Sequence, residues 1–143
     1  AARDRVALVT FGGAAAQHLS PPTRNHVLLT SLLARVTPGG TTPLADGIAA
    51  TCEVVRRERA RHPGGSIAVL LLTDGRANVS AGGGDPLTDA HRHAESLGGL
   101  GVDVFVVGEE TWHTRRLAQR SRGRLVTPWW RAETASPDPV RAA

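Results

Sequence analysis

Two polar loops of the sequence carry residue types that could bind a metal ion. Residues 39–44 (GGTTPL) precede a long helical segment, and residues 73–75 (TDG) follow the most apolar run of the chain. The hydroxyl of Thr42 and the carboxylate of Asp74 are hard oxygen ligands, the kind that Mg²⁺ binds while it keeps several waters. Taken separately, Thr42 is also a helix-capping residue and Asp74 also suits an Asx turn.

Other chemistry finds weaker support. His91 and His93 lie two apart on a predicted helix and point to different faces, while the remaining histidines show no ligand spacing and are interpreted as surface or turn residues. Cys52 is the only cysteine, which excludes an intrachain disulfide and a cysteine-based zinc site, and its place on an apolar helix face favours a packed thiol. The absence of lysine excludes a Walker-type ATP site. The sequence has no Gly-x-Ser-x-Gly motif, the signature that would indicate a hydrolase.

Predicted strands and helices alternate along the chain and position the two loops. Apolar, β-branched runs predict strands over residues 5–11, 67–72, 102–107 and 124–126, and a weaker edge strand over residues 15–19 that ends at Ser20-Pro21-Pro22. Residues 67–72 form an unbroken apolar run, which is typical of a strand buried on both faces of a parallel sheet.

Helical spacing predicts four helices. The first follows Thr23 as its N-cap and ends before Pro38, and the second runs from Thr42 as cap and Pro43 as first residue to about Arg61. The third begins at Asp85-Pro86 and closes at Gly98-Gly99, and the fourth spans residues 111–122. This order predicts the α/β class, with a doubly wound, mostly parallel sheet and helices on both faces.

Composition limits the class of protein. The 143 residues suit one domain, which we place at residues 1–128, followed by a flexible tail at 129–143 that begins with Trp129-Trp130. The formal charge is +4, but the 17 arginines are scattered among 13 acidic residues, which disfavours nucleic-acid binding. No apolar run is long enough for a membrane span, and no signal peptide opens the chain. The single cysteine suits a reducing compartment, so we expect a cytoplasmic protein.

Four segments in order resemble the von Willebrand factor A domain of magnesium-chelatase D subunits and related chelatase proteins. They are DRVALVTF (4–11), GGTTPLA (39–45), LLTDGRAN (71–78) and GGDPL (83–87), and the similarity covers roughly residues 3 to 127. The resemblance implies a metal-ion-dependent adhesion site built from three loops. Thr42, with Thr41 the less favoured choice, matches the threonine of the second loop, and Asp74 matches the aspartate of the third.

The first loop of that family, Asp-x-Ser-x-Ser, does not occur in this sequence. The resemblance therefore implies a domain without its first strand and first helix and an incomplete metal site. Because the family's first strand lies between those equivalent to residues 5–11 and 67–73, these two strands should either pair directly or each leave an unpaired edge.

The resemblance also implies a function. We expect a non-catalytic, metal-ion-dependent docking module of a complex in which ATPase subunits drive metal insertion into a tetrapyrrole. The expected partners are other chelatase-like subunits, one of which supplies an acidic residue that completes the coordination of Mg²⁺. The alternative is a von Willebrand A interaction module of another ATPase-linked system.

Overall fold

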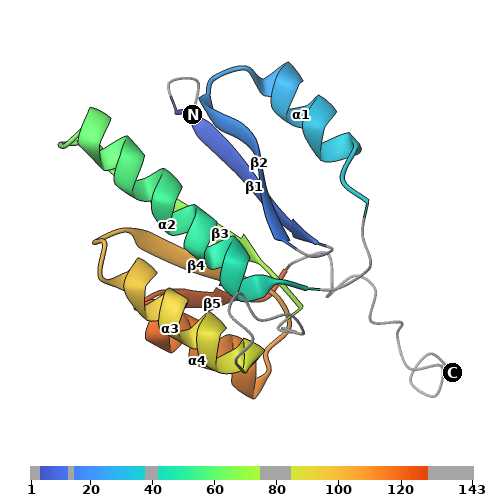
Figure 1. Ribbon diagram of the computed structural model, residues 1–143, viewed down its shortest axis with the longest axis vertical. Helices are drawn as coiled ribbons and strands as arrows, with labels where there is room; N and C mark the ends of the chain where they lie inside the picture. The colour runs from blue at the N-terminus through green and yellow to red at the C-terminus, as the bar shows by residue number, and fades with distance from the viewer. Residues whose placement is uncertain (1–3, 13–14, 38–41, 75–84, 129–143) are drawn as a thin grey trace, which may run out of the picture.

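The computed structural model describes residues 4–12, 15–37, 42–74 and 85–128 (Figure 1). Strands and helices alternate along these residues in the predicted order. They are β1 (Val6–Gly12), β2 (Ala15–Thr23), α1 (His26–Ala34), α2 (Leu44–Arg61), β3 (Ala68–Leu72), α3 (Pro86–Gly98), β4 (Asp103–Val107), α4 (Trp112–Arg120) and β5 (Arg124–Val126). Trp129-Trp130 and the predicted tail lie outside the described residues.

The described strands form two separate sheets. β3, β4 and β5 are parallel and adjacent in that order, with Leu72 opposite Val107 and Val107 opposite Val126. β1 and β2 form an antiparallel pair. The α/β class with a parallel sheet is therefore confirmed. Within the described residues β1 and β3 are not hydrogen-bonded to each other, so the two strands leave unpaired edges, the second of the two expected arrangements.

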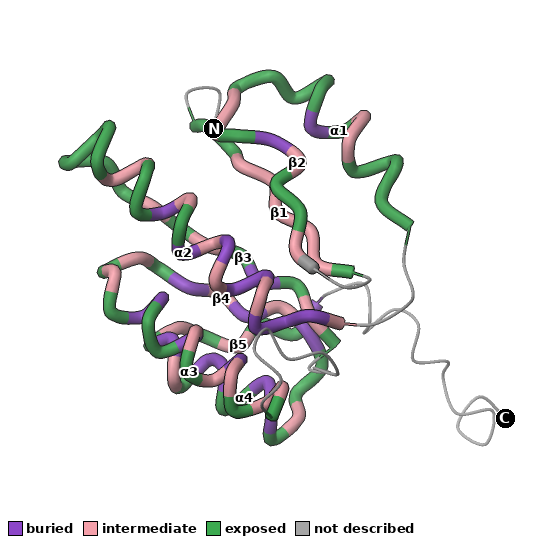
Figure 2. Tube along the Cα trace, viewed as in Figure 1, coloured by how far each residue is buried: buried purple, intermediate pink, exposed green. Residues whose placement is uncertain are grey.

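The core lies between the parallel sheet and the three helices α2, α3 and α4. α2 presents Leu44, Ile48, Cys52 and Val55 at helical spacing, and all four are buried. Leu97 of α3, Leu117 of α4 and Val106 of β4 join the same cluster. Figure 2 shows buried stretches along α2, α3, α4 and the parallel sheet. Burial raises the pKa of the Cys52 thiol, as expected for a packed side chain.

Helix α2 also joins the two sheets, because it contacts β1 and β2 as well as the core of the parallel sheet. The approach to β1 is so close that a Cβ on Gly47 would lie 2.5 Å from the ring of Phe11. At the first turn of α2, Asp46 Oδ2 accepts a hydrogen bond from the backbone N–H of Ala16 at 2.6 Å. Only glycine at position 47 lets the helix and the hairpin pack this tightly.

The structure corrects two predicted boundaries near the hairpin. β2 continues through Ser20, Pro21 and Pro22 to Thr23, because its outer edge has no strand partner among the described residues and proline therefore removes no ladder hydrogen bond. The N-cap of α1 is Asn25, whose Oδ1 accepts from the backbone N–H of Leu28 at 3.0 Å, and not Thr23 as predicted. The Thr23 hydroxyl instead accepts from the Asn25 N–H at 3.1 Å.

The expectation that β3 is buried on both faces is wrong. Leu71 faces the core at 8% exposure, whereas Leu70 and Leu72 on the opposite face are 64% and 58% exposed. Alternate residues of a strand point to opposite faces, so the helices that bury Leu71 leave its two neighbours in solvent. No helix of the described residues is long and apolar enough to cross a membrane.

Candidate functional site

The predicted metal ligands lie at the edge of the sheet where the parallel strands end. A helix that connects two parallel strands runs opposite to them, so α3 and α4 begin at this edge. α2 leads into β3 and also begins there, as Figure 1 shows. The carboxyl edge of a parallel sheet is the usual place for a ligand site in this class of fold.

Backbone hydrogen bonds tie the end of β3 to β4 and the end of β4 to β5. The Thr73 N–H donates to the Val107 carbonyl at 3.1 Å, and the Gly108 N–H donates to the Val126 carbonyl at 3.1 Å. Gly108 lies so near Thr73 that a Cβ at this position would overlap the Thr73 carbonyl oxygen. Asp74 follows directly and is exposed. Asp74 therefore follows a hydrogen-bonded strand end and is exposed to solvent.

Thr42 lies directly before α2, but it is not the helix cap. Pro43 takes the N-cap position with non-helical backbone angles and makes no side-chain cap hydrogen bond, and its carbonyl accepts from the Gly47 N–H at 3.0 Å. The Thr42 carbonyl accepts from the Leu44 N–H at 2.9 Å. The prediction of Thr42 as cap and Pro43 as first helical residue is therefore wrong by one position. Thr41 and the preceding glycines lie outside the described residues.

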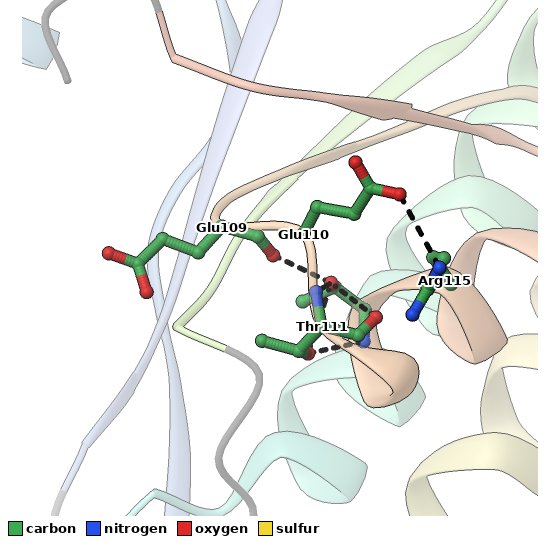
Figure 3. Close-up of polar contacts among 5 residues, drawn as sticks. Glu109, Glu110, Thr111 and Arg115 are labelled. Atoms are coloured by element: carbon green, nitrogen blue, oxygen red, sulfur yellow. Dashed lines mark hydrogen bonds and ion pairs between the residues drawn. The ribbon is translucent and has the colours of Figure 1, made fainter. Parts of the chain in front are cut away.

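Sequence reasoning missed a second carboxylate at this edge. Glu109 follows β4 as Asp74 follows β3, each two residues beyond the paired residues Val107 and Leu72. Figure 3 shows Glu109 and Glu110 pointing in opposite directions, with Glu110 toward Arg115, to which it is paired at 3.6 Å. In the sequence Glu109 is only an acidic residue after an apolar run, and its place at this edge depends on β4 being parallel to β3.

Thr111 is the N-cap of α4 and follows Glu110 directly. Its hydroxyl accepts from the Thr114 N–H at 3.1 Å, and the Thr114 hydroxyl in turn accepts from the Thr111 N–H at 2.9 Å, which is a capping box. The Thr114 hydroxyl also donates to the Glu109 carbonyl at 2.7 Å. These bonds fix the backbone from which Glu109 projects.

The donor chemistry of this edge suits a hard divalent cation, but the described ligands are few. Thr42 offers a hydroxyl, and Asp74 and Glu109 offer carboxylates. Among the described residues no group of three or more His, Cys, Asp or Glu side chains could hold a metal ion. Mg²⁺ takes six oxygen ligands, several of them waters. These residues are therefore ligands of the type that Mg²⁺ binds, but they are too few to complete a site.

A histidine pair joins α3 to α4, against the interpretation of His113 as a surface or turn residue. His91 Nε2 and His113 Nδ1 lie 3.0 Å apart, and His113 is only 4% exposed. Trp112 meets both imidazole rings edge-on, with ring centroids 6.2 Å from His91 and 5.6 Å from His113. The two histidines are 22 positions apart, so no local spacing could have indicated the pair.

The pair favours the neutral form of both rings. In their hydrogen bond one nitrogen must donate and the other accept. With one further proton on the pair, the hydrogen bond persists only in states in which His113 Nε2 carries an N–H, and this atom is buried and has no hydrogen-bond partner among the described residues. Burial lowers the pKa of both histidines. The charges of Arg116 and Arg120 lower the pKa of His91 further, and Asp85 opposes them.

Comparison with known proteins identifies the fold. The family of the von Willebrand factor type A domain matches residues 1–76. The chain belongs to this family. The von Willebrand A domain of SpRpn10 superimposes on the chain with a TM-score of 0.65, at 17% identity, and covers 87% of this chain and 64% of that one. BatB from Bacteroides thetaiotaomicron gives a TM-score of 0.63 at 15% identity, over 87% of this chain and 70% of that one.

Sequence relatives connect this von Willebrand A domain to magnesium chelatase. The magnesium-chelatase 60 kDa subunit of Cereibacter sphaeroides is 40% identical over 111 residues, which are 75% of this chain and 20% of that subunit. An uncharacterized protein of Mycobacterium tuberculosis is 36% identical over 137 residues, 95% of this chain and 21% of that protein. The chain therefore spans about a fifth of the length of these relatives and is a von Willebrand A domain similar to magnesium-chelatase subunits.

Proposed function

We propose that this von Willebrand A domain is a metal-ion-dependent docking module of a magnesium-chelatase-like complex. In such a complex ATPase subunits drive the insertion of a metal ion into a tetrapyrrole, and this chain contributes contact without catalysis. The observation that carries the proposal is the exposed Asp74 at the carboxyl end of β3, the edge at which Thr42 leads into α2. A cytoplasmic location is part of the same proposal.

Thr42 and Asp74 are the residues that would hold Mg²⁺. The ion would supply a positive charge at the sheet edge, to which an acidic residue of a partner subunit binds. Since the described residues give too few ligands, the remaining oxygens must come from the partner, from water and from an Asp-x-Ser-x-Ser loop such as the family has. Glu109 is a further carboxylate within this edge.

The magnesium-chelatase relatives favour this system over another ATPase-linked one, because the SpRpn10 and BatB structures share the fold at low identity and indicate no common partner. The partners we propose are accordingly other chelatase-like subunits.

The test uses a longer chain that includes an Asp-x-Ser-x-Ser loop, with a magnesium-chelatase ATPase subunit as partner. Binding of the two proteins is measured with and without Mg²⁺, for the unchanged chain and for Thr42→Ser and Thr42→Ala. We expect Thr42→Ser to keep Mg²⁺-dependent binding and Thr42→Ala to weaken it about tenfold, because only serine retains the ligand oxygen.

Thr30→Ala is the matched control, since it removes a threonine hydroxyl from the exposed face of α1, where the Thr30 hydroxyl donates to the His26 carbonyl. It should leave binding unchanged. Equal loss of binding in Thr42→Ser and Thr42→Ala would count against the hydroxyl as the ligand. Binding without any Mg²⁺ dependence would contradict the proposed function itself.

A further inference from the structure

A surface hollow of about 530 Å³ lies between α3 and α4. Its wall from α3 includes Asp85, Leu87 and His91, and its wall from α4 includes Trp112, Arg115 and Arg116. Asp85 is the N-cap of α3 and Trp112 is the first residue of α4, so the hollow begins at the same carboxyl edge of the sheet as the proposed metal site.

Trp112 is exposed and yet held in place. Its residue exposure is 62%, although the indole packs edge-on against the two imidazoles of the His91–His113 pair. A large aromatic side chain that is already ordered loses little conformational entropy when a partner covers it. Tryptophan and arginine are also the residues that most often dominate the binding energy of protein interfaces.

The charged side chains of the hollow are mainly arginines, and these arginines can pair with a ligand. Arg115 pairs with Glu110 only at 3.6 Å, with both side chains more than 60% exposed, which is a weak surface pair. Arg116 donates to Gln119 at 3.4 Å and forms no ion pair with the carboxylates that the structure describes. The one carboxylate on the wall is already engaged, because Asp85 Oδ2 accepts from the Thr88 N–H at 3.1 Å and from the Thr88 hydroxyl at 2.6 Å.

We propose that this hollow binds an acidic segment of a partner protein. Carboxylates of the segment would pair with Arg115 and Arg116, and an apolar side chain beside them would pack on Trp112 and Leu87. A protein segment fits better than a phosphate group, because Leu87 and Trp112 offer surface to an apolar side chain, which a phosphate group lacks. The inference rests on the proposed docking function, which it extends by a second contact and by the chemistry of the partner.

The probe is a library of random peptides displayed on phage, selected on the immobilised 143-residue chain without added metal. We expect the selected peptides to combine two or more acidic residues with a neighbouring apolar one. Calorimetry with a synthetic copy of such a peptide should show affinity about tenfold weaker for the double variant Arg115→Gln and Arg116→Gln. Both arginines are exposed, so this variant should melt at the temperature of the unchanged chain.

The matched control is the double variant Arg57→Gln and Arg61→Gln, which makes the same charge change at exposed positions of α2 and should keep the peptide affinity. Equal loss in the two double variants would overturn the proposal, because it would show attraction by net charge alone. Selected peptides without acidic enrichment, or displacement of the peptide by inorganic phosphate or a single-stranded oligonucleotide at similar concentration, would overturn it as well. Asp74→Ala should not affect peptide affinity, so a failed metal site and a failed hollow are told apart.

Discussion

Asp74 and Glu109 occupy matching positions at the ends of neighbouring parallel strands. Asp74 could be predicted from its motif, because a short polar turn directly after an unbroken apolar strand marks the carboxyl edge of a parallel sheet. Glu109 could not be ranked in the same way, since its importance depends on β4 lying beside β3. At the scale of single residues, sequence thus proposes a candidate when its local context is distinctive and passes over one whose position depends on strand order.

The His91–His113 pair makes the stability of the fold depend on pH. Burial and nearby charges lower the pKa of both histidines in the folded chain, so the unfolded chain binds more protons around their ordinary pKa of about 6.5. The stabilisation from this pair is therefore complete above about pH 6.5 and is lost as the pH falls through that value toward the lowered pKa values.

We expect the melting temperature of the chain to fall between pH 7.5 and pH 5.5, and to fall less in His91→Gln, which removes one of the two titrating rings. Thermal unfolding followed by circular dichroism at a series of pH values measures this. His26→Gln is the control, because His26 is exposed at the start of α1. A pH dependence that His91→Gln and His26→Gln change equally would contradict the assignment to the pair.

At the scale of elements, the predicted boundaries succeed where the local signals agree. α3 begins at Asp85-Pro86 as predicted, because a capping carboxylate and a first-turn proline point to the same residue. The α1 cap was misplaced, since Thr23 and Asn25 are both capping types and only the structure shows which side chain reaches a helical N–H. The sequence also could not show which face of α1 is exposed, because Val27 is apolar and yet 81% exposed.

The two threonines that precede helices at the sheet edge should differ in their effect on stability. Thr111→Ala removes a capping box and should lower the free energy of unfolding by about 1 kcal/mol. Thr42→Ala should lower it less, because Thr42 is not the N-cap of α2. Chemical denaturation of both variants tests the comparison. A larger loss in Thr42→Ala than in Thr111→Ala would mean that the α2 terminus has been assigned wrongly.

At the scale of the whole molecule, the alternation of strands and helices predicted the α/β class, while the packing of the sheet faces could not be predicted. The apolar run ending in β3 indicates a strand covered on both sides, yet Leu70 and Leu72 are exposed. A local pattern reports what a strand is suited to contact and does not report which elements are there to cover it. The unpaired edges of β1 and β3 among the described residues, by contrast, are one of the two arrangements that the resemblance implied.

Exposed apolar side chains beside an unpaired strand edge favour self-association. We expect the 143-residue chain to form concentration-dependent oligomers in sedimentation velocity, and the double variant Leu70→Gln and Leu72→Gln to be more monomeric. Val27→Gln, which removes an exposed apolar side chain from α1, serves as control and should not change the oligomers. A chain extended by the family's first strand and helix should also be monomeric. Unchanged oligomers in the double variant would exclude this face as the contact.

Calorimetric titration of Mg²⁺ tests the central claim most directly. The two proposed ligands, Thr42 and Asp74, one neutral and one charged, should leave the ion nearly as hydrated as in bulk water, so the 143-residue chain should not bind Mg²⁺ at millimolar concentrations. In a chain that restores an Asp-x-Ser-x-Ser loop, binding should appear, and Asp74→Ala should abolish it together with partner docking. Tight binding by the 143-residue chain itself, or binding in the restored chain that Asp74→Ala leaves intact, would contradict a metal site formed by Thr42 and Asp74.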